Sequence, residues 1–522
     1  MAAKVVIVGG GSAGWMTACY LKSALTHLQD VTLIESPNIR TIGVGEATFS
    51  TVKLFFDYLG LAEHEWMPPC NGTYKLAVRF QNWAGNGEHF YHPFQRYEVV
   101  DGFNLGEWWL KLFRGERAFD AACFTTTSLC EHLRSPRFLN GEIFDDRVAA
   151  YFGTSAPPNT VIAHHTVQYP YGYHFDAALL AEFLKRQALK RGVSHLIDDV
   201  TEVKRGDDGS ILHVVTRDHG RVEGDLFIDC TGFRGLLINE ALKEPFLEFK
   251  DKLPNDRAVA IQVPTDARNE GIRPYTTATA LSCGWAWTIP LYNRNGCGYV
   301  YCSKYIGSEE AEAELRAFLG PGAKGCPANH IKMRIGRNRN SWVKNCVAIG
   351  LSSGFVEPLE STGIFFIQHG IEELVNHFPA GHTPSEGQIL SYNRTINDCI
   401  DGIREFLSIH YRASNRSDTR YWREMKLLKG PDAREERLKI WQCRLPGARN
   451  IYQPFHGFEA YSYSVILLGL GYKPEAYLPS LDLRDEASAR AMFRSIRDKS
   501  DRLVRTLPSH YEYLRQMRTS PD

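Results

Sequence analysis

The sequence predicts a mixed α/β fold, an α/β core joined to a mainly helical second part, and three observations predict it. A strand, a glycine-rich turn, a helix and a second strand follow one another over 4–35. Short apolar runs of strand length recur at 226–230 and 346–349, and helical periodicity dominates after residue 370. With 522 residues, the chain is long enough to bury a large core in two or three packed lobes.

The first element has the pattern of a nucleotide-binding β-α-β unit. Residues 5–8 form a β-branched run, typical of a strand buried on both faces. Glycines follow at the GxGxxG spacing: Gly9, Gly11 and Gly14. They permit a tight turn, close approach to a pyrophosphate and close packing of the helix over 12–28. Glu35 ends the second strand, where a carboxylate can accept ribose hydroxyls. The unit predicts dinucleotide binding, with a glycine-rich turn in an ordinary α/β domain as the alternative.

Charge and composition exclude several classes of partner. Basic and acidic residues number 60 each, so the net charge is zero and we expect no nucleic acid and no membrane as partner. No apolar run approaches the length of a membrane span, and the first strand follows the N-terminus closely, so a cytoplasmic location is predicted. The 12 cysteines form no CxxC pair or metal-ligand cluster, so we expect free, mostly buried thiols and no metal site.

The segments after Glu35 predict a loop, strands and one candidate lysine. Residues 40–52 should form a loop that returns to the dinucleotide, and the alternation over 71–83 predicts a strand with Lys75 in its middle. From this pattern alone, Lys75 is more typical of a solvated side chain than of a catalytic one. Residues 148–166 are irregular and predict a mobile surface loop. Further elements are expected at 177–191 (helix), 195–203, 211–216 and 226–230 (strands).

Two aromatic segments are candidates for a substrate pocket. His92, Pro93 and Phe94 lie in an aromatic-rich stretch whose rings could sandwich a planar substrate, although a second hydrophobic core is an equal alternative. Trp285 and Trp287 lie on one face of an extended segment over 284–290, where they form either a wall or ordinary core packing.

Residues 345–370 form the second informative stretch, a strand, a Gly/Ser loop and a helix that starts near Ser361. Glu360 precedes this helix, and the backbone N–H groups of Thr362 and Gly363 lie in its first turn, where an anion is favoured. A carboxylate beside an anion site suggests that the two sites have different roles in one reaction. The alternative is that Glu360 only caps the helix. Later helices are expected at 385–408, 432–442, 458–470 and 486–504.

Three motifs together make the chain resemble the flavin-dependent tryptophan halogenases: the GxGxxG turn, GWAWTIP (284–290) and FVEPLESTG (355–363). The resemblance runs nearly end to end and is closest to members that act at C5 or C6 of the indole. It implies an FAD-binding core of the two-dinucleotide-fold, flavoprotein monooxygenase-like type. We expect this discontinuous core at 1–85 and 170–370, and a mainly helical substrate-binding subdomain at 86–169 and 371–522.

The resemblance also implies roles for individual residues. Lys75 matches the catalytic lysine of the family, and Glu360 matches the glutamate that faces the substrate. Positions that match or are expected to form the FAD site are Gly9, Gly11, Ser12, Ala13, Gly14, Glu35, Gly45, Ala47, Val200, Asp229, Gly232, Leu351 and Ile364. Thr362 and Gly363 match the chloride site. Substrate contacts are expected from Phe49, His92, Pro93, Phe94, Glu360, Tyr461, Tyr463 and Ser464, and the tunnel wall from Trp285 and Trp287.

The family's reaction, as the resemblance implies it, uses FADH2 from a separate NAD(P)H-dependent flavin reductase, together with O2 and chloride or bromide. A flavin hydroperoxide oxidises chloride to HOCl, which reaches Lys75 and there forms either a hydrogen bond or a chloramine. Glu360 then stabilises the arenium intermediate and takes up the ring proton. The expected substrate is L-tryptophan or a related indole, and a homodimer is expected.

Ring position and reaction class have alternatives. NGTYKLAVRFQ and GLSSGFVEPLESTG resemble 6-halogenases, whereas HGFEAYS resembles 5-halogenases, so we favour chlorination at C6 over C5. The nearest alternative enzyme is a flavin monooxygenase that hydroxylates an aromatic substrate. From another class, the alternative is a non-catalytic flavin-binding protein.

Overall fold

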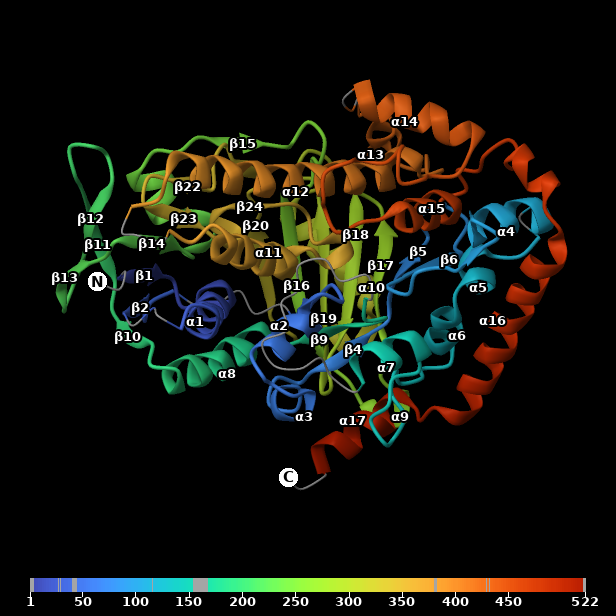
Figure 1. The fold of residues 1–522 in the computed structure, drawn as a ribbon, viewed down its shortest axis with the longest axis horizontal. Coiled ribbons are helices and arrows are strands. Elements are labelled where there is room, and N and C mark those ends of the chain that lie inside the picture. The colour runs from blue at the N-terminus through green and yellow to red at the C-terminus, as the bar shows by residue number, and fades with distance from the viewer. Residues whose placement is uncertain are drawn as a thin grey trace.

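The computed structural model describes residues 4–26, 28, 30–39, 45–114, 116–153, 168–379, 383–428, 430 and 432–519. One layer is a six-stranded sheet in the order β10-β2-β1-β14-β23-β22 (Figure 1). Its neighbours run parallel except β22 and β23. The strands are β1 (Val5–Val8), β2 (Val31–Glu35), β10 (Ser194–Ile197), β14 (Leu226–Asp229), β22 (Trp342–Val343) and β23 (Cys346–Ala348). All four residues of β1 are buried, which confirms the prediction from its β-branched run.

Three helices pack around this sheet: α1 (Ser12–Ala24), α8 (Ala177–Lys190) and α11 (Gly363–Asn376). Helix α1 contacts β1 and β2 and also contacts α8 and α11. The predicted helix over 12–28 was too long, because Leu25 leaves the helical region and the chain turns there, with Leu28 N donating to Leu25 O. Helix α1 therefore begins directly after the glycine-rich turn.

The central layer is a seven-stranded sheet in the order β20-β16-β19-β18-β17-β5-β6, seen upright in the middle of Figure 1. Its strands are β5 (Ala77–Gln81), β6 (His89–Pro93), β16 (Arg257–Pro264), β17 (Tyr275–Leu281), β18 (Gly284–Pro290), β19 (Arg294–Tyr301) and β20 (Ala328–Lys332). Only β17 and β5 pair in parallel; the other neighbours are antiparallel. The expected domain boundary at residue 85 falls in the turn between the paired strands β5 and β6.

Two of the predicted strands are each divided into two. The strand over 71–83 is interrupted at Leu76, whose N–H donates to Pro274 O; β4 (Thr73–Lys75) therefore joins a small sheet with β3 (Glu46–Ala47) and β9 (Gly172–Phe175). The strand over 195–203 is interrupted at Asp198, whose carboxylate accepts the N–H groups of Asp199, Asp218 and His219 and turns the chain away from the sheet.

Three further small sheets complete the β structure of the described residues. They contain β11 (Val200–Arg205), β12 (Ile211–Thr216) and β13 (Gly220–Glu223); β15 (Phe246–Glu248), β21 (Gly336–Asn338) and β24 (Gly354–Phe355); and β7 (Val99–Val100) with β8 (Phe103–Asn104). The β11–β13 sheet projects from one end of the molecule in Figure 1.

Several of the other helices gather at the opposite end (Figure 1). They are α4 (Leu105–Phe113), α5 (Phe119–Cys123), α6 (Thr125–Glu131), α14 (Asp432–Cys443), α15 (Ala460–Gly469) and α16 (Glu486–Thr506). Helix α12 (Glu386–Ala413) is the link, because it runs from the first layer to this end. Helices α7 (Asp146–Phe152), α13 (Arg420–Met425) and α17 (His510–Thr519) lie nearer the middle of the view. Shorter or peripheral helices are α2 (Val52–Tyr58), α3 (Glu63–Trp66), α9 (Ala267–Glu270) and α10 (Ser308–Leu319).

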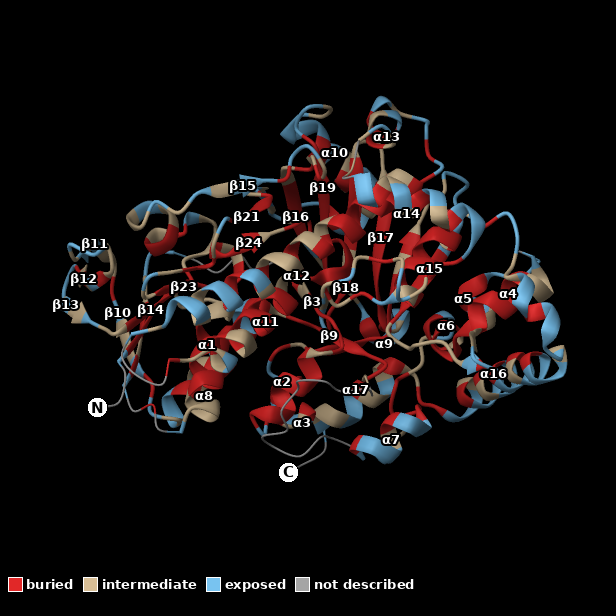
Figure 2. Cartoon of the chain, turned by 45° about the horizontal axis from the view of Figure 1, so that its top comes forward, coloured by how far each residue is buried: buried red, intermediate tan, exposed pale blue. Residues whose placement is uncertain are grey.

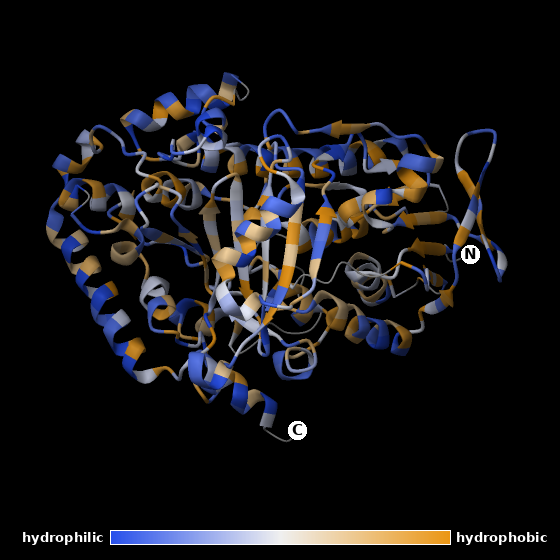
Figure 3. Cartoon of the chain, turned by 180° about the vertical axis from the view of Figure 1, so that it is seen from behind, coloured by the Kyte–Doolittle hydropathy of each residue, from blue (hydrophilic) through white to orange (hydrophobic). Residues whose placement is uncertain are grey.

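Burial follows these layers. Buried residues concentrate in the strands of the two main sheets, and exposed residues line α16 and the projecting sheet (Figure 2). Figure 3 shows hydrophobic and hydrophilic residues alternating along α16, whose inward residues include Ala489, Phe493 and Leu503. All 12 cysteines are free and nine are buried, as predicted. Within the described residues, no helix combines the length and apolar character needed to cross a bilayer.

The surface loop predicted over 148–166 begins inside α7, and its residues 154–166 lie outside the described residues. Two helix ends also differ from prediction. The helix over 385–408 continues to Ala413, and the helix predicted to start near Ser361 starts at Gly363 because Glu360 and Ser361 both have positive φ.

Candidate active site

A cavity of about 490 Å³ lies at the ends of β1 and β2 and extends to the start of α11. Eleven of the residues predicted to bind the cofactor line it: Gly9, Gly11, Ser12, Ala13, Glu35, Gly45, Ala47, Val200, Gly232, Leu351 and Ile364. They come from segments spread over more than 350 positions, which the fold gathers at one edge of the parallel sheet. This edge is where α/β folds bind nucleotides.

The other two predicted cofactor residues do not line this cavity. A Cβ at Gly14 would lie 1.9 Å from Gly9 O, so Gly14 lets α1 pack against the glycine turn. The Asp229 carboxylate is fully buried and accepts from Leu237 N (2.8 Å), Ile238 N (2.9 Å) and Thr231 N (3.0 Å). Asp229 therefore stabilises the turn after β14, behind the cavity wall.

The cavity fits a dinucleotide in its backbone geometry. A Cβ at Gly9 would lie 2.3 Å from Cys230 O, and one at Gly10 would lie 2.3 Å from Glu35 Cγ, so neither position has room for a side chain. An added Cβ at Gly11 would meet nothing within 4 Å, which leaves space for a phosphate beside the first N–H groups of α1. Glu35 lies at the end of β2, where its carboxylate also contacts His195 Nε2 at 2.8 Å.

Lys75 is fully buried, so its side chain is not solvated as its strand pattern suggested. Its Nζ donates to Ser361 Oγ (2.8 Å) and Thr48 O (3.2 Å), and it lies 5.0 Å from the centroid of the Phe94 ring. Burial lowers the pKa of Lys75 to about 7, while the negative charge of Glu360 acts in the opposite direction. Near neutral pH, this side chain therefore has both ammonium and amine forms available.

Glu360 lies next to Ser361, the hydrogen-bond partner of Lys75. It is buried and lines the cavity together with Ser361. Both residues have left-handed backbone angles (φ 66° and 64°), a conformation that is costly for side chains larger than glycine and is often found at functional sites. Through Ser361, the strained turn brings the Glu360 carboxylate and the Lys75 ammonium into one polar cluster.

Two histidines hold the Glu360 carboxylate. His92 Nδ1 and His410 Nε2 lie 2.8 Å and 3.1 Å from Glu360 Oε1. Burial acts to raise the pKa of Glu360, but the charge of these histidines and their hydrogen bonds outweigh it and lower the pKa to about 2. The carboxylate thus stays ionised across the whole physiological range.

Several predicted substrate residues surround this cluster. Phe49 packs edge-on against Phe94 (6.3 Å between ring centroids), and His92 lies 6.1 Å from Tyr461. Pro93 ends β6 between His92 and Phe94. The structure therefore brings five of the predicted substrate residues around Lys75 and Glu360.

The other two lie farther along α15. Tyr463 OH is paired with His456 Nε2 at 2.7 Å, and its ring packs on Phe406 and Trp441. Ser464 Oγ donates to Ala460 O within the same helix. Both side chains are fully buried, and the described contacts do not connect them directly with Lys75, Glu360 or His92.

The predicted wall and halide residues also meet the cavity. Trp285 and Trp287 line it with their ring centroids 6.3 Å apart. Trp285 Nε1 donates to the buried Glu357 carboxylate at 3.0 Å, whereas Trp287 Nε1 has no partner among the residues that the structure describes. Gly363 lines the cavity at the first turn of α11, and the almost fully buried Thr362 is the residue that precedes this helix.

Some residues of the site were not predicted. Ser361 and Thr48 bond Lys75, and their places next to Glu360 and in the predicted 40–52 loop were the only sequence signals. Glu357 lies within the FVEPLESTG motif, although nothing in the sequence singled out its contact with Trp285, and His410 had no signal. His410 lies beyond the predicted end of its helix, and it reaches Glu360 only because α12 crosses the molecule.

Comparison with known proteins agrees with this geometry. The sequence profile of the tryptophan halogenase family matches residues 4–486. The chain is 54% identical over 520 residues to the tryptophan 6-halogenase SttH of Streptomyces toxytricini, covering 98% of each chain, and its fold matches the SttH crystal structure with a TM-score of 0.94 over 99% of each chain.

Two further relatives are similarly close. The chain is 53% identical to the 7-chloro-L-tryptophan 6-halogenase KtzR of Kutzneria sp. (strain 744), covering 98% of this chain and 99% of KtzR. It is 51% identical to Tar14, a tryptophan C-6 flavin-dependent halogenase from taromycin biosynthesis, with a TM-score of 0.94, covering 99% of this chain and all of Tar14. The protein belongs to the tryptophan halogenase family.

Proposed function

We propose that the protein chlorinates C6 of the indole of free L-tryptophan and uses FADH2, O2 and chloride. The observation that carries the proposal is the polar cluster in which Lys75 bonds Ser361, next to Glu360, and Glu360 lines a cavity that fits a dinucleotide. The position C6 is supported by the names of SttH, KtzR and Tar14, which share 51–54% identity with this chain.

The residues present fit FAD as the cofactor. The N-terminus of α1 and Gly11 would hold the pyrophosphate, Glu35 the ribose, and the lining from Gly45, Ala47 and Ile364 the rest of the molecule. When bound, reduced flavin supplies with O2 the two-electron oxidation that converts chloride into HOCl. Bromide would serve as a second halide.

The start of α11 is the proposed halide site. Thr362 and Gly363 precede and open this helix, so their N–H groups lie at the positive end of the helix dipole, where an anion is stabilised. Trp285 and Trp287 would separate this site from the indole by their bulk. HOCl is small enough to pass such a wall, whereas tryptophan is not.

Lys75 is proposed as the acid of the chlorination step. Its ammonium donates a hydrogen bond to the oxygen of HOCl, and as the ring carbon takes the chlorine with loss of the O–Cl bond, the ammonium gives its proton to the departing hydroxide to form water. A pKa near 7 suits this transfer, because the acid is then both abundant and strong at neutral pH. Lys75 is left as an amine, which solvent protonates again.

Glu360 is proposed as the partner that faces the arenium cation. Its carboxylate stabilises the positive charge of the ring and then accepts the proton from C6, which restores aromaticity. The balanced reaction is replacement of one ring hydrogen by chlorine with release of water. His92 and Phe94 would hold the indole between them, with the Pro93 carbonyl accepting from the indole N–H, so that only one ring carbon meets Lys75.

The amino-acid end of the substrate is proposed to lie toward α15, near Tyr461, Tyr463 and Ser464, with Phe49 closing the opposite side. Because Tyr463 and Ser464 are bonded to other residues here, their role requires α15 or the 453–458 segment to shift on binding. A flavin reductase as the source of FADH2 and a homodimeric assembly also belong to this proposal.

The test is a product analysis. The purified protein is incubated in air with L-tryptophan, FAD, an NADH-dependent flavin reductase, NADH and chloride, and the product is identified by mass and NMR. We expect 6-chlorotryptophan, and 6-bromotryptophan when bromide replaces chloride. A hydroxylated product that is the same with either halide would instead support a flavin monooxygenase, and FAD binding with no product a non-catalytic protein.

A parallel reaction with 7-chloro-L-tryptophan decides between two substrates, because one close relative is named for that compound. We expect a higher kcat/KM for unsubstituted tryptophan. The reverse order would make a ring-chlorinated tryptophan the substrate without changing the reaction class.

A further inference from the structure

The two oxygens of the Glu360 carboxylate have different surroundings. Oε1 lies 2.8 Å from His92 Nδ1 and 3.1 Å from His410 Nε2. No hydrogen bond from the described residues reaches Oε2, and Glu360 lines the cavity. The two histidines therefore hold one oxygen of the carboxylate, and the other has no partner among the described residues.

His410 has an acceptor at each of its ring nitrogens. Nδ1 lies 3.1 Å from Phe406 O, a carbonyl that can only accept, so Nδ1 carries a proton. Nε2 faces the carboxylate of Glu360, and an unprotonated Nε2 would set its lone pair against an oxygen lone pair. The contact at 3.1 Å therefore requires a second proton, on Nε2 or on Glu360.

The surroundings favour the proton on His410. This residue lies in the last turn of the 28-residue helix α12, where the negative end of the helix dipole stabilises a cation. The rings of Phe80, Trp83 and Phe406 lie 5.1–6.2 Å from its centroid, and Glu360 is the carboxylate that the described contacts place against it.

The other titratable groups that face Glu360 are Lys75 from β4, His92 from β6 and Tyr461 from α15. Of these three, His92 also contacts Oε1, at 2.8 Å, whereas no hydrogen bond joins Lys75 or Tyr461 to Glu360 in the part of the chain that the structure describes. Burial acts to raise the pKa of Glu360, and the two histidines together, His92 before His410, lower it.

We propose that His410 is a positioning residue of the halogenation site, an imidazolium that donates to Glu360 Oε1, keeps Glu360 ionised and fixes its Oε2 toward the indole. The proposal rests on the proposed function, since it assigns the direction and charge of the group that receives the ring proton. His410 does not touch the substrate and acts only through Glu360.

The variants that test it are His410→Phe, which keeps an aromatic ring but removes the donor, and His410→Gln, whose amide can still donate to Oε1 without a charge. Asn393→Leu is the matched control. Asn393 is buried on the same helix and makes two hydrogen bonds to the Trp342 backbone, and it has no contact with Glu360.

For His410→Phe we expect kcat for tryptophan to fall about tenfold or more with KM nearly unchanged. The pKa of Glu360 should rise, because burial then acts without the opposing imidazolium. His410→Gln should recover most of the rate at pH 7–8. Asn393→Leu should lower the melting temperature and leave kcat and KM unchanged. A wild-type kcat in His410→Phe would overturn the proposal.

A measurement without turnover separates this proposal from the proposed function. In 15N-histidine-labelled protein, the signals lost in His410→Gln identify His410, and we expect both of its ring nitrogens to be protonated at pH 7. In Glu360→Gln the second proton should be lost. An unprotonated Nε2 in the wild type would overturn the proposal even if the enzyme is active, whereas failure of the wild type to chlorinate tryptophan would overturn the proposed function alone.

Discussion

At the residue scale, Lys75 is the residue on which chlorination depends most. Replacing it with methionine keeps the length of the side chain but removes the proton donor, so we expect the rate of chlorination to fall by at least about 100-fold. The folded state should not suffer, because a fully buried nitrogen with a strongly lowered pKa is itself costly to bury. Product yield, FAD affinity and the melting temperature are the measurements. Loss of folding or of FAD affinity together with activity would show that Lys75 is structural.

The pH dependence of chlorination is a second consequence of Lys75. An acid with a pKa near 7 is protonated below that pH, so chlorotryptophan formed per NADH consumed should fall as pH rises through about 7. Glu360, with its pKa near 2, stays ionised between pH 5 and 9, so its titration does not change the yield of chlorotryptophan in this range. NADH oxidation by the reductase without the protein is the control. A yield that rises through pH 7 would instead favour the amine, and with it a chloramine.

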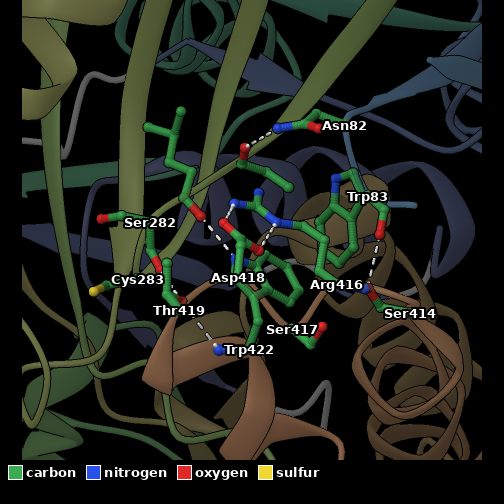
Figure 4. A network of polar contacts seen from close by, with 12 residues as sticks. Asn82, Trp83, Ser282, Cys283, Ser414, Arg416, Ser417, Asp418, Thr419 and Trp422 are labelled. Carbon is green, nitrogen blue, oxygen red and sulfur yellow. Dashed lines mark hydrogen bonds and ion pairs between the residues drawn. The ribbon is translucent and has the colours of Figure 1, made fainter. Parts of the chain in front are cut away.

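At the element scale, the end of α12 is held by a network that Figure 4 shows in close-up. Ser414 Oγ donates to Trp83 O (2.7 Å), and Arg416 bonds Asp418 through two nitrogens and packs over the Trp422 ring. Ser414→Ala removes a fully buried hydrogen bond, so we expect a loss of about 1–2 kcal/mol in the free energy of unfolding. Asp418→Asn should cost less, about 0.5 kcal/mol, because that carboxylate is half exposed. Urea titration compares the two, and equal losses would contradict this reasoning.

The helices and strands also show how much of the fold can be predicted from the sequence. The β1–α1–β2 unit, β18 and α11 were predictable because each has a strong local pattern: a β-branched run, alternation, or a glycine-rich turn. The breaks at Leu76 and Asp198 were not, since each depends on a hydrogen bond to a distant partner, Pro274 for one and the 218–219 backbone for the other. The contact between His410 and Glu360 was not predictable either, because only the path of α12 through the fold brings His410 to Glu360.

At the scale of the whole molecule, the cavity and the polar cluster lie where the two main sheets and α11 meet. We propose that the part around the six-stranded sheet holds the flavin and that the helical part holds tryptophan, with Trp285 and Trp287 between them. The pairing of β5 with β6 makes the two parts share one sheet. Separate folding of either part is therefore not expected, and heat should unfold them in one transition.

Binding of the cofactor should stabilise this single unit as a whole. With FAD at about 100 times its Kd, linkage predicts about 2.7 kcal/mol of added stability, seen as a higher melting temperature. Gly14→Ala should abolish the increase, because its Cβ would lie 1.9 Å from Gly9 O and force α1 away from the turn that would hold the pyrophosphate. Gly387→Ala is the control, since its Cβ would meet nothing within 4 Å and lies on exposed α12 surface. An FAD shift in Gly14→Ala as large as in Gly387→Ala would mean that FAD does not bind at this turn.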